Sequence, residues 1–587
     1  MKTITLKENS IKIGSENYLA DYLINLGIKS EDVDSFLNEP KEQDLDNPYD
    51  LNNMEAALCA MNAAVIANKK FFLQVDCDVD GFTSSAIFYQ FFKTLYPSID
   101  IQYRLQTGKE HGVFLDTIPE DREVIIIPDA GSMQLDEQEA LSKAGKTVII
   151  LDHHTVLDHR PLENVIIVNN QDSPNFSNKN LSGAGVVFLF VKAYDEKYSN
   201  GCLWSSYMDL AALGIVADMM DTRTLGNNYI IQNGFKQIRN KIFRELLLRA
   251  NYSIADISNP TKVDVAFYVA PIINGLIRSG KQEEKELFFR AMITDDSNEF
   301  IESTNRGAIR METLYQNAVR IAANAKGRQD SAKKRSSEFI NRKIKTEKLD
   351  ENAVIVVALN GSETPQVDPN ITGLAAMELV KTYNKPVLVL REHIDETGEP
   401  FYSGSGRSKD FYGVKPLLNI ILDSKAAIFA EGHGNAFGTA FSKGGLKSFI
   451  NYSNDLLKDV DFNNDCIEVD YWFKDSVDIK AVEDFANGTK IYGNGIPQPK
   501  FAFSFTMSQN EISLIGKDAD TIKFYTNGID FVMFKQPGLA RQLKNSVKNR
   551  ITVVGRAQIN TFNNRPQVII DSMDIAPVAV TDMLDLI

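Results

Sequence analysis

The stretch FFLQVDCDVDG, residues 71–81, decides how the first half of this chain folds. Its opening FFLQV is short and mostly apolar, which is typical of a buried β-strand. Three carboxylates, Asp76, Asp78 and Asp80, follow within five positions. Like charges this close repel one another unless something positive lies between them. The residues that follow, GFTSSAIFYQFFKTLY, predict a helix, so the acidic group stands at the junction of a strand and a helix.

The same pattern returns downstream. Strands are predicted at 123–129, 146–152 and 164–170, with helices between them, which indicates a parallel α/β sheet. Asp129 ends the first of these strands, and the triplet Asp152-His153-His154 ends the second. Because ligand sites in parallel α/β sheets form outside the carboxyl ends of the strands, we expect these side chains to converge there.

A further acidic residue, Asp218, interrupts the apolar segment LGIVADMM, and a buried carboxylate requires a cation or hydrogen-bond donors. Each signal alone has a structural explanation, since acids at strand ends are often turn formers or helix N-caps and DHH could be a solvated turn. Together they predict a metal site. Carboxylates with imidazoles suit Mn²⁺ or Mg²⁺ better than a thiolate-rich zinc site does.

Length and composition limit the class of protein to which this chain can belong. The 587 residues exceed one hydrophobic core and suggest about four domains. The four cysteines have no CxxC spacing, which favours a reduced cytosol over a disulfide framework or a structural zinc site. No apolar run approaches the length of a membrane helix, and the N-terminus has no secretory apolar core. We therefore expect a cytoplasmic protein without a membrane partner.

The formal net charge of −15 argues against a nucleic-acid partner, because phosphate contacts need Lys and Arg. The objection is not decisive. A local basic groove can coexist with an acidic exterior, and carboxylates that hold metal ions are neutralised.

Changes of pattern along the chain predict five parts. They are an N-terminal helical, peripheral extension (1–55), a parallel α/β domain (56–235), a helical region that ends in a long connecting helix over 302–348 (236–350), a smaller α/β domain (351–460), and a strand-rich barrel or sandwich (461–587).

Six segments resemble the DHH phosphoesterase superfamily. Four resemble its catalytic motifs and two resemble its DHH-associated domain: DCDVDG (76–81), PDAG (128–131), LDHH (151–154), LGIVAD (213–218), SGSGRS (403–408) and EGHGNAFG (431–438). These segments leave pyrophosphatases, oligoribonucleases and cyclic-dinucleotide phosphodiesterases open.

Further segments narrow the resemblance to the RecJ family of single-strand-specific DNA exonucleases. They are LSGAGVVFLF (181–190), APIINGLIRSG (270–280), YGNGIPQPKF (492–501) and the stretch 553–575, of which the last two fall in that family's OB-fold. The resemblance implies a metal-dependent enzyme that uses two Mn²⁺ or Mg²⁺ ions to release mononucleotides from the 5′ end of single-stranded DNA. It also implies a monomer in DNA recombination and repair, with a single-strand-binding protein or a helicase as candidate partners.

The resemblance also implies residue roles. Asp78 and Asp80 would each hold one metal, Asp129 would bridge both, His153 and Asp218 would complete the second, His154 would face the scissile phosphate, and Asp76 would support the shell. Phosphate contacts would come from Ser405 and Arg407 at the 5′-phosphate, Arg104 and Arg278 nearby, and His433 near the reacting group. Without the resemblance, we would interpret Arg407 as a member of a surface ion pair and Arg278 as a cation at the end of a helix.

The chain departs from the family pattern at five positions. Gln74 stands where many DHH relatives have a histidine, and Ala130, His111, Asp368 and Glu431 replace Asn, an aromatic residue, His and Gly. These departures leave two rivals open: a nuclease for short RNA or cyclic dinucleotides, and a catalytically weak nucleic-acid-binding relative. The OB-like C-terminus argues against the first and the intact acidic and histidine set against the second.

Overall fold

The computed structural model describes residues 3–7, 14–107, 111–156, 158, 160–295, 298–305, 308–360, 367, 371–395, 398–411, 413–462, 466–474, 477–544, 548–560 and 563–577. The chain divides into two compact units. The inserted unit comprises Met1–Thr5 and Ala325–Glu468, and the main unit comprises Leu6–Asn324 and Val469–Ile587. We describe each unit by itself.

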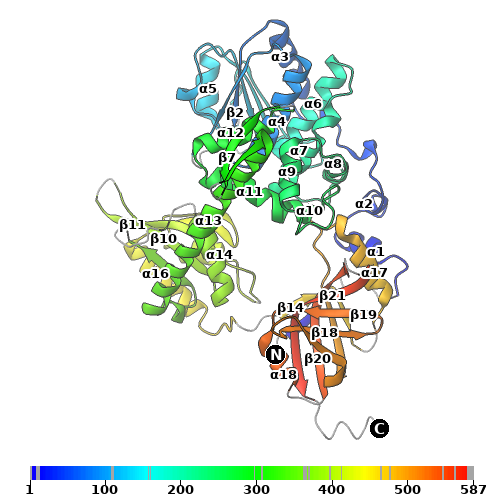
Figure 1. The fold of residues 1–587 in the computed structure, drawn as a ribbon. Helices are drawn as coiled ribbons and strands as arrows, with labels where there is room; N and C mark the ends of the chain where they lie inside the picture. Colours follow the sequence, from blue (N-terminus) through cyan, green and yellow to red (C-terminus); the bar gives the residue numbers. More distant parts are fainter. Residues whose placement is uncertain are drawn as a thin grey trace. The chain divides into compact units, whose positions relative to one another are not determined.

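A five-stranded parallel sheet forms the first half of the main unit, as the alternating strand and helix pattern predicted. Its order is β3 (Ile101–Leu105), β2 (Phe71–Val75), β4 (Val124–Pro128), β5 (Thr147–Asp152) and β6 (Val165–Asn169). Helix α5 (Leu135–Lys143) covers one face, and α4 (Val79–Leu95) and α6 (Gly183–Tyr198) cover the other (Figure 1). Because all five strands run the same way, their carboxyl ends share one edge.

Helix α7 (Met208–Ala217) packs against α4 and α6 and is buried along nearly its whole length. Its sequence MDLAALGIVA is apolar on every side, which is typical of a helix surrounded by protein. This packing brings Asp218, the residue that ends the helix, toward the sheet edge.

A helical region follows, as predicted. It consists of α8 (Leu225–Lys236), α9 (Lys241–Arg249), α10 (Lys262–Asp264), the π-helix η5 (Val265–Val269), α11 (Ala270–Ser279), α12 (Gln282–Met292) and the long α13 (Leu314–Thr346). The prediction of a helix over 302–348 is wrong at its start. There the strands β7 (Phe300–Asn305) and β8 (Ala308–Thr313) form an antiparallel hairpin. Aromatic and β-branched residues in FIESTN favour a strand over a helix.

The inserted unit contains a second five-stranded sheet. Its order is β12 (Phe429–His433), β13 (Ala436–Ser442), β11 (Pro400–Arg407), β10 (Val387–Ile394) and β9 (Ile355–Leu359), and only the β9–β10 pair is parallel. Helix α14 (Thr372–Tyr383) packs on one face together with Ile340 and Ile344 of α13. Helices α15 (Leu417–Ser424) and α16 (Lys443–Leu456) pack on the other. Outside this sheet, β1 (Thr3–Leu6) pairs with β14 (Cys466–Val469).

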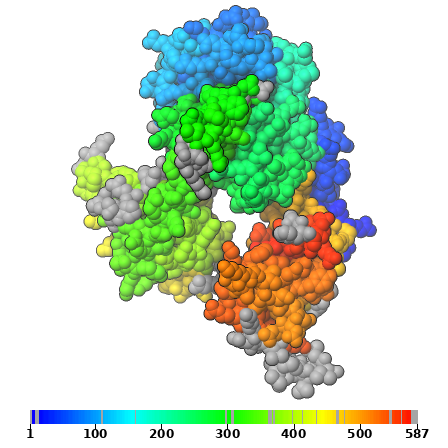
Figure 2. Space-filling model, in the orientation of Figure 1, coloured from blue at the N-terminus to red at the C-terminus, as the bar shows by residue number. Residues whose placement is uncertain are grey.

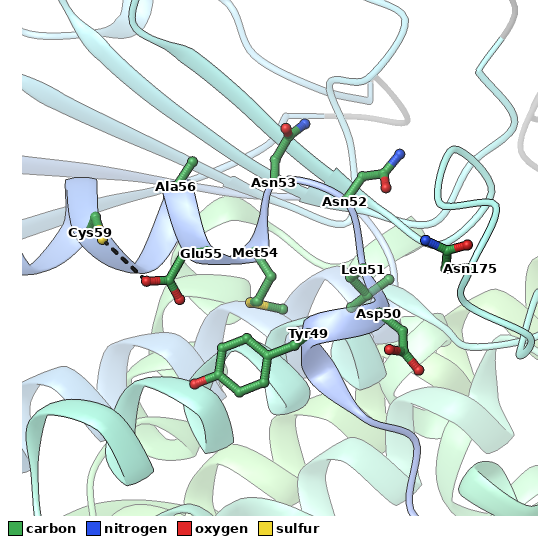
Figure 3. A pocket seen from close by; sticks show the side chains of 10 residues that line it. All are labelled: Tyr49, Asp50, Leu51, Asn52, Asn53, Met54, Glu55, Ala56, Cys59 and Asn175. Carbon is green, nitrogen blue, oxygen red and sulfur yellow. Dashed lines mark hydrogen bonds between the residues drawn. The ribbon is translucent and has the colours of Figure 1, made fainter.

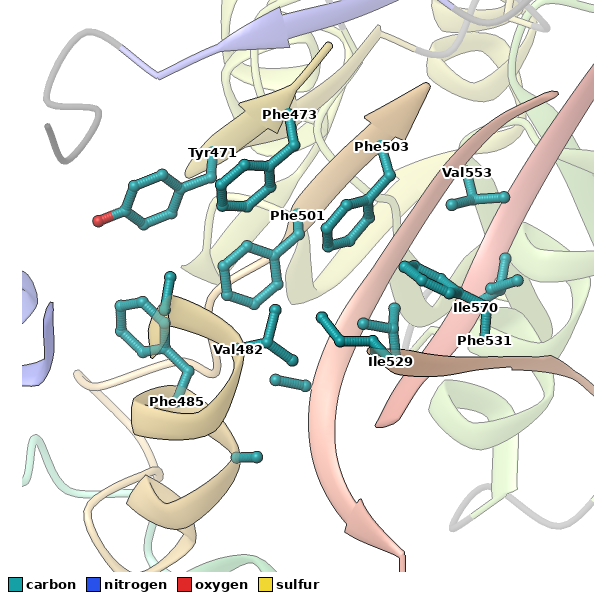
Figure 4. Close-up of a cluster of buried hydrophobic side chains, with 14 of the residues drawn as sticks. Tyr471, Phe473, Val482, Phe485, Phe501, Phe503, Ile529, Phe531, Val553 and Ile570 are labelled. Carbon is teal, nitrogen blue, oxygen red and sulfur yellow. The ribbon is translucent and has the colours of Figure 1, made fainter. Parts of the chain in front are cut away.

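A seven-stranded sheet, called the C-terminal sheet below, completes the main unit. Its order is β15 (Tyr471–Phe473), β16 (Phe501–Ser508), β20 (Lys548–Asn560), β21 (Arg565–Pro577), β19 (Ile529–Met533), β18 (Thr521–Thr526) and β17 (Ile512–Ile515). Its inner face carries closely spaced aromatic rings, among them Phe501, Phe503 and Phe531, which α17 (Ile479–Asn487) covers (Figure 4).

The N-terminal segment is not peripheral, contrary to expectation. It contributes α1 (Tyr18–Asn25) and α2 (Val33–Leu37), and Tyr18, Tyr22 and Leu23 are buried in the aromatic core of the C-terminal sheet. The Tyr22 ring packs edge-on against Phe485 at 5.7 Å, and its hydroxyl donates to the Pro497 carbonyl at 2.6 Å. In Figure 2 the blue N-terminal segment lies against the orange C-terminal residues. Within the described residues, every helix is too short or too polar to cross a bilayer.

Replacing Tyr22 with alanine should therefore loosen the C-terminal sheet. We expect a loss of about 3 kcal/mol, the scale for deleting a buried aromatic ring. Amide hydrogen exchange in β16 and β20 should then accelerate by roughly 100-fold, while exchange in β4 and β5 stays unchanged. Tyr525→Ala, at a residue 60% exposed on β18, is the matched control. Unchanged amide exchange rates in β16 and β20 of the Tyr22 variant would contradict the role of Tyr22 in the core of the C-terminal sheet.

Candidate metal centre

The carboxyl edge of the parallel sheet gathers the acidic and histidine residues that the sequence singled out. Their potential ligand atoms form three overlapping groups: Asp76 with Asp78 and Asp129, Asp129 with His153 and His154, and Asp80 with His153 and Asp218. In each group, one ligand atom from each residue lies within 4.8 Å of the others. All seven residues predicted for the metal and catalytic set are thus brought together.

Asp80 is held by the N-terminus of α6. Its carboxylate accepts hydrogen bonds from the Ser182 hydroxyl at 2.9 Å, the Gly183 amide at 2.6 Å and the Ala184 amide at 3.1 Å. The positive end of a helix dipole stabilises a carboxylate in this position. Helix α7 also approaches Asp80 closely. A Cβ atom on Gly214 would lie 2.3 Å from Asp80 Oδ1, so this position of the helix requires a glycine.

Asp129 is the least satisfied carboxylate of the cluster. It is buried in a left-handed backbone conformation, with φ of 60°, which is uncommon for a residue with a side chain. Its Oδ1 atom accepts no hydrogen bond from the described part of the chain. Burial, reinforced by the charge of Asp80, raises the pKa of Asp129 well above its usual range. A buried acceptor in this state calls for a cation.

The pKa values of Asp78 and Asp218 are also raised by burial and by neighbouring negative charge. Asp78 caps α4 by accepting from the Gly81 amide at 2.9 Å, and burial followed by repulsion from Asp80 raises its pKa. The same two causes raise the pKa of Asp218 to about 8. Near neutral pH the metal-free cluster therefore retains protons where cations would otherwise balance its charge.

The two histidines differ in the direction in which their pKa values are shifted. Burial lowers the pKa of His153, so its imidazole is neutral near pH 7. Its Nε2 atom lies 3.2 Å from Asp129 Oδ1, 3.7 Å from Asp218 Oδ2 and 4.0 Å from Asp80 Oδ2. In contrast, a hydrogen bond to Asp152 raises the pKa of His154 to about 9, so that ring is a cation. His153 suits a metal ligand and His154 suits an anion contact.

The sequence placed Asp152 at this edge without assigning it a role, and the structure shows that it positions both histidines. Burial opposes its charge, but hydrogen bonds, first from His154, lower its pKa. It accepts from His154 Nδ1 at 2.8 Å and from the His153 amide at 2.7 Å. Asn169, at the end of β6, donates to the His154 carbonyl at 3.0 Å. In the sequence, two asparagines, Asn169 and Asn170, directly follow the predicted strand NVIIV, and this pair was the signal that could have identified Asn169.

The five departures from the family pattern have different structural contexts. Gln74 is buried, its Nε2 donates to the Arg104 carbonyl at 3.1 Å, and its Oε1 accepts no hydrogen bond from the described residues. Ala130 is buried beside the sheet, and His111 contacts Asp76 at 2.6 Å. Glu431 is exposed on β12, and Asp368 lies outside the described residues.

The predicted phosphate-binding residues fall into two sets. In the main unit, Arg104 lies on β3 beside Gln74, and Arg278 is exposed in the last turn of α11. In the inserted unit, Ser405 and Arg407 lie on β11 against the N-terminus of α14. Ser405 Oγ is 3.0 Å from Thr372 Oγ1, and a Cβ atom on Gly373 would lie 2.7 Å from Arg407 Nη2. His433 ends β12, and its side chain is outside the described part.

A groove of about 1070 Å³ lies in the main unit. Its lining includes Val216 and Met219, which are within two positions of Asp218 in sequence, and Gln558 of β20. Phe267 and Tyr268 of the π-helix, which are 71% and 40% exposed, also line it. Sequence reasoning did not identify these two aromatic residues, because they resemble ordinary apolar positions of a helix.

A second hollow has a volume of about 530 Å³. It is lined by residues 49–56 together with Cys59 and Asn175 (Figure 3). It includes none of the residues predicted for the site.

Comparisons with known proteins agree with this geometry. Residues 70–215 match the N-terminal domain of the DHH family, and residues 474–572 match the RecJ OB domain, which confirms the predicted OB-fold in the C-terminal sheet. The crystal structure of RecJ in complex with Mn²⁺ from Thermus thermophilus shares the fold, with a TM-score of 0.68 and 20% identity over 96% of this chain and 76% of that one.

Two sequence relatives define the relationship further. A Bacillus subtilis protein assigned as the SPbeta prophage-derived single-strand DNA-specific exonuclease YorK is 34% identical over 96% of this chain and 97% of its own length. The single-stranded-DNA-specific exonuclease RecJ of Haemophilus influenzae is 20% identical over 81% of this chain and 82% of its own. With a near full-length relative at this identity, the chain belongs to the RecJ-like family of single-strand DNA-specific exonucleases.

Proposed function

We propose that this protein is a metal-dependent exonuclease that removes mononucleotides from the 5′ end of single-stranded DNA. The observation that carries the proposal is the buried Asp129 Oδ1 atom, which lies at the junction of overlapping ligand groups and accepts no hydrogen bond from the described residues. Carboxylates and a neutral imidazole suit Mn²⁺ or Mg²⁺. Two such ions, when bound, lower the pKa of water and stabilise the attacking and leaving oxygens of a phosphodiester.

In this proposal each residue keeps the role that the resemblance implied. Asp78 and Asp80 would hold one ion each, Asp129 would be shared by both sites, His153 and Asp218 would complete the second site, and Asp76 would support the set. His154 remains protonated because Asp152 holds its Nδ1 proton, and it donates a hydrogen bond to the scissile phosphate.

The groove supports a strand rather than a small cyclic substrate. Its lining includes residues close to Asp218 in sequence together with residues of the OB-fold strands, a surface that a cyclic dinucleotide would not need. Exposed Phe267 and Tyr268 offer faces on which unpaired bases can stack, and this contribution does not depend on net positive charge. A net charge of −15 is thus compatible with a DNA substrate.

We place recognition of the 5′-phosphate in the inserted unit. There Ser405 and Arg407 lie beside the first turn of α14, where backbone amides and the helix dipole favour an anion. Arg104, Arg278 and His433 are proposed to contact nearby phosphates. The domain limits 1–55, 56–235, 236–350, 351–460 and 461–587 remain our working division. We further propose that the enzyme acts as a cytoplasmic monomer in recombination and repair, with a single-strand-binding protein or a helicase as partners to test.

Digestion of end-labelled oligonucleotides tests the function directly. With Mn²⁺ or Mg²⁺ present, we expect mononucleotides from single-stranded DNA whose 3′ end is blocked, and none when the 5′ end is blocked. RNA of the same sequence and cyclic dinucleotides should be poor substrates. Preferential cleavage of either one would overturn the proposed substrate.

Asp129→Asn tests the metal assignment. Asparagine tolerates the left-handed conformation and removes the buried carboxylate, so the metal-free protein should melt at an unchanged or higher temperature. The rise in melting temperature that Mn²⁺ causes in the parent should disappear, and hydrolysis should fall by about 100-fold or more. The exposed Asp116→Asn should retain both properties. A full Mn²⁺-induced stabilisation in the Asp129 variant would remove this residue from the ligand set.

Arg407→Ala tests the end-binding role. An arginine that grips a phosphate contributes about 1.5–3 kcal/mol, so cleavage of 5′-phosphorylated strands should fall by about 10–100-fold. Strands with a 5′-hydroxyl should be affected little. Arg391→Ala, on the neighbouring strand β10, serves as the control. Equal losses on both kinds of strand would place Arg407 outside the 5′-phosphate pocket.

A further inference from the structure

The second residue of DCDVDG, Cys77, has no role in the proposed hydrolysis. It is buried, with 7% of its surface exposed, although it lies between two candidate metal ligands in sequence. Its Sγ atom is 3.7 Å from both ring nitrogens of His111. His111 Nδ1 in turn lies 2.6 Å from Asp76 Oδ2. A thiol, an imidazole and a carboxylate therefore converge at the rim of the cluster, with one ligand atom of each within 4.8 Å of the others.

One of the two contacts already has the spacing of a zinc site. Typical zinc–sulfur and zinc–nitrogen bonds with tetrahedral angles place the two donor atoms about 3.6 Å apart. The 3.7 Å between Cys77 and His111 needs almost no adjustment. The shorter contact between His111 and Asp76 would open by about 0.8 Å, since zinc-bound nitrogen and oxygen lie about 3.4 Å apart. The His111 side chain is 60% exposed, so it has room to move and the site is reachable from solvent.

The chemistry of this group differs from that of its neighbours. The three overlapping groups described above offer only oxygen and imidazole donors, whereas this one adds sulfur, a ligand that selects softer metals. Asp76 belongs both to this group and to the group with Asp78 and Asp129. An ion at one position would thus compete for a carboxylate needed at the other.

We propose that Asp76, Cys77 and His111 form a binding site for a thiophilic divalent cation of the zinc class. The ion is held by Cys77 Sγ, a ring nitrogen of His111 and a carboxylate oxygen of Asp76, with water completing its coordination. Through the shared Asp76, occupancy of this site disturbs the adjacent Mn²⁺ or Mg²⁺ ligands and inhibits the enzyme. The binding claim is independent of the proposed nuclease function, whereas the inhibition rests on it.

Cobalt substitution tests the binding claim without any activity measurement. Co²⁺ added to the full-length protein should produce the near-ultraviolet charge-transfer band that only a thiolate ligand gives. The band should be absent in Cys77→Ser and weakened in His111→Phe, and Zn²⁺ should displace it. Cys59→Ser, which removes an exposed cysteine on α3 (Met54–Ile66), should leave the band unchanged. Absence of the band in the parent protein, or its survival in Cys77→Ser, would overturn the site.

Inhibition is then measured separately. With Mn²⁺ at a saturating concentration, the zinc concentration that halves cleavage of single-stranded DNA should rise at least about tenfold in Cys77→Ser, the scale of losing a group that supports a metal ion. Each rate is compared with the zinc-free rate of the same variant. Equal sensitivity to zinc in parent and variant would disprove inhibition through this site. A cobalt band without cleavage of any DNA would refute the nuclease proposal while leaving the cation site intact.

Discussion

Repulsion between buried carboxylates at one edge of a parallel sheet is the constraint on which the rest of this structure depends. Asp78, Asp129 and Asp218 all have pKa values raised by burial and by their acidic neighbours. Such a cluster costs stability in the metal-free protein, and proteins retain groups of this kind mainly where a function needs them. The surrounding elements compensate only in part: the N-terminus of α6 stabilises Asp80, whereas Asp129 keeps an oxygen without a hydrogen bond from the described residues.

Close packing of two helices surrounds the most buried carboxylates. A Cβ atom on Gly183 would lie 2.4 Å from Asp129 Oδ1, and one on Gly214 would lie 2.3 Å from Asp80 Oδ1. Glycines at these two positions let α6 and α7 approach the carboxylates directly. Electrostatic interactions are stronger in buried surroundings than in solvent, which favours binding of a cation. The same glycines therefore serve the packing of the helices and the chemistry of the site.

The chain offers two surfaces that suit different parts of a nucleic acid. The groove lined by residues near Asp218 offers aromatic faces and OB-fold residues, and the inserted unit offers Ser405 and Arg407 at a helix N-terminus. The first suits unpaired bases of any sequence and the second suits a terminal phosphate. In the function that we propose, phosphate recognition is confined to a few positions, so an acidic protein needs no overall positive surface to act on DNA.

The sequence by itself determined the parallel sheet and the convergence of its acidic residues. Short apolar strands alternating with helices leave few other arrangements, and parallel strands end on one edge, so Asp76, Asp129 and Asp152 had to meet. Only the tertiary structure decided the contact between His111 and Asp76, which are 35 positions apart, and the burial of Tyr18 and Tyr22 in a sheet more than 400 positions away. The hydrophobic periodicity of the sequence indicates which face of a helix or strand is buried. It does not indicate which distant segment covers that face, because apolar packing is non-directional. A loop residue such as His111 belongs to no periodic pattern, so its contacts cannot be predicted in this way.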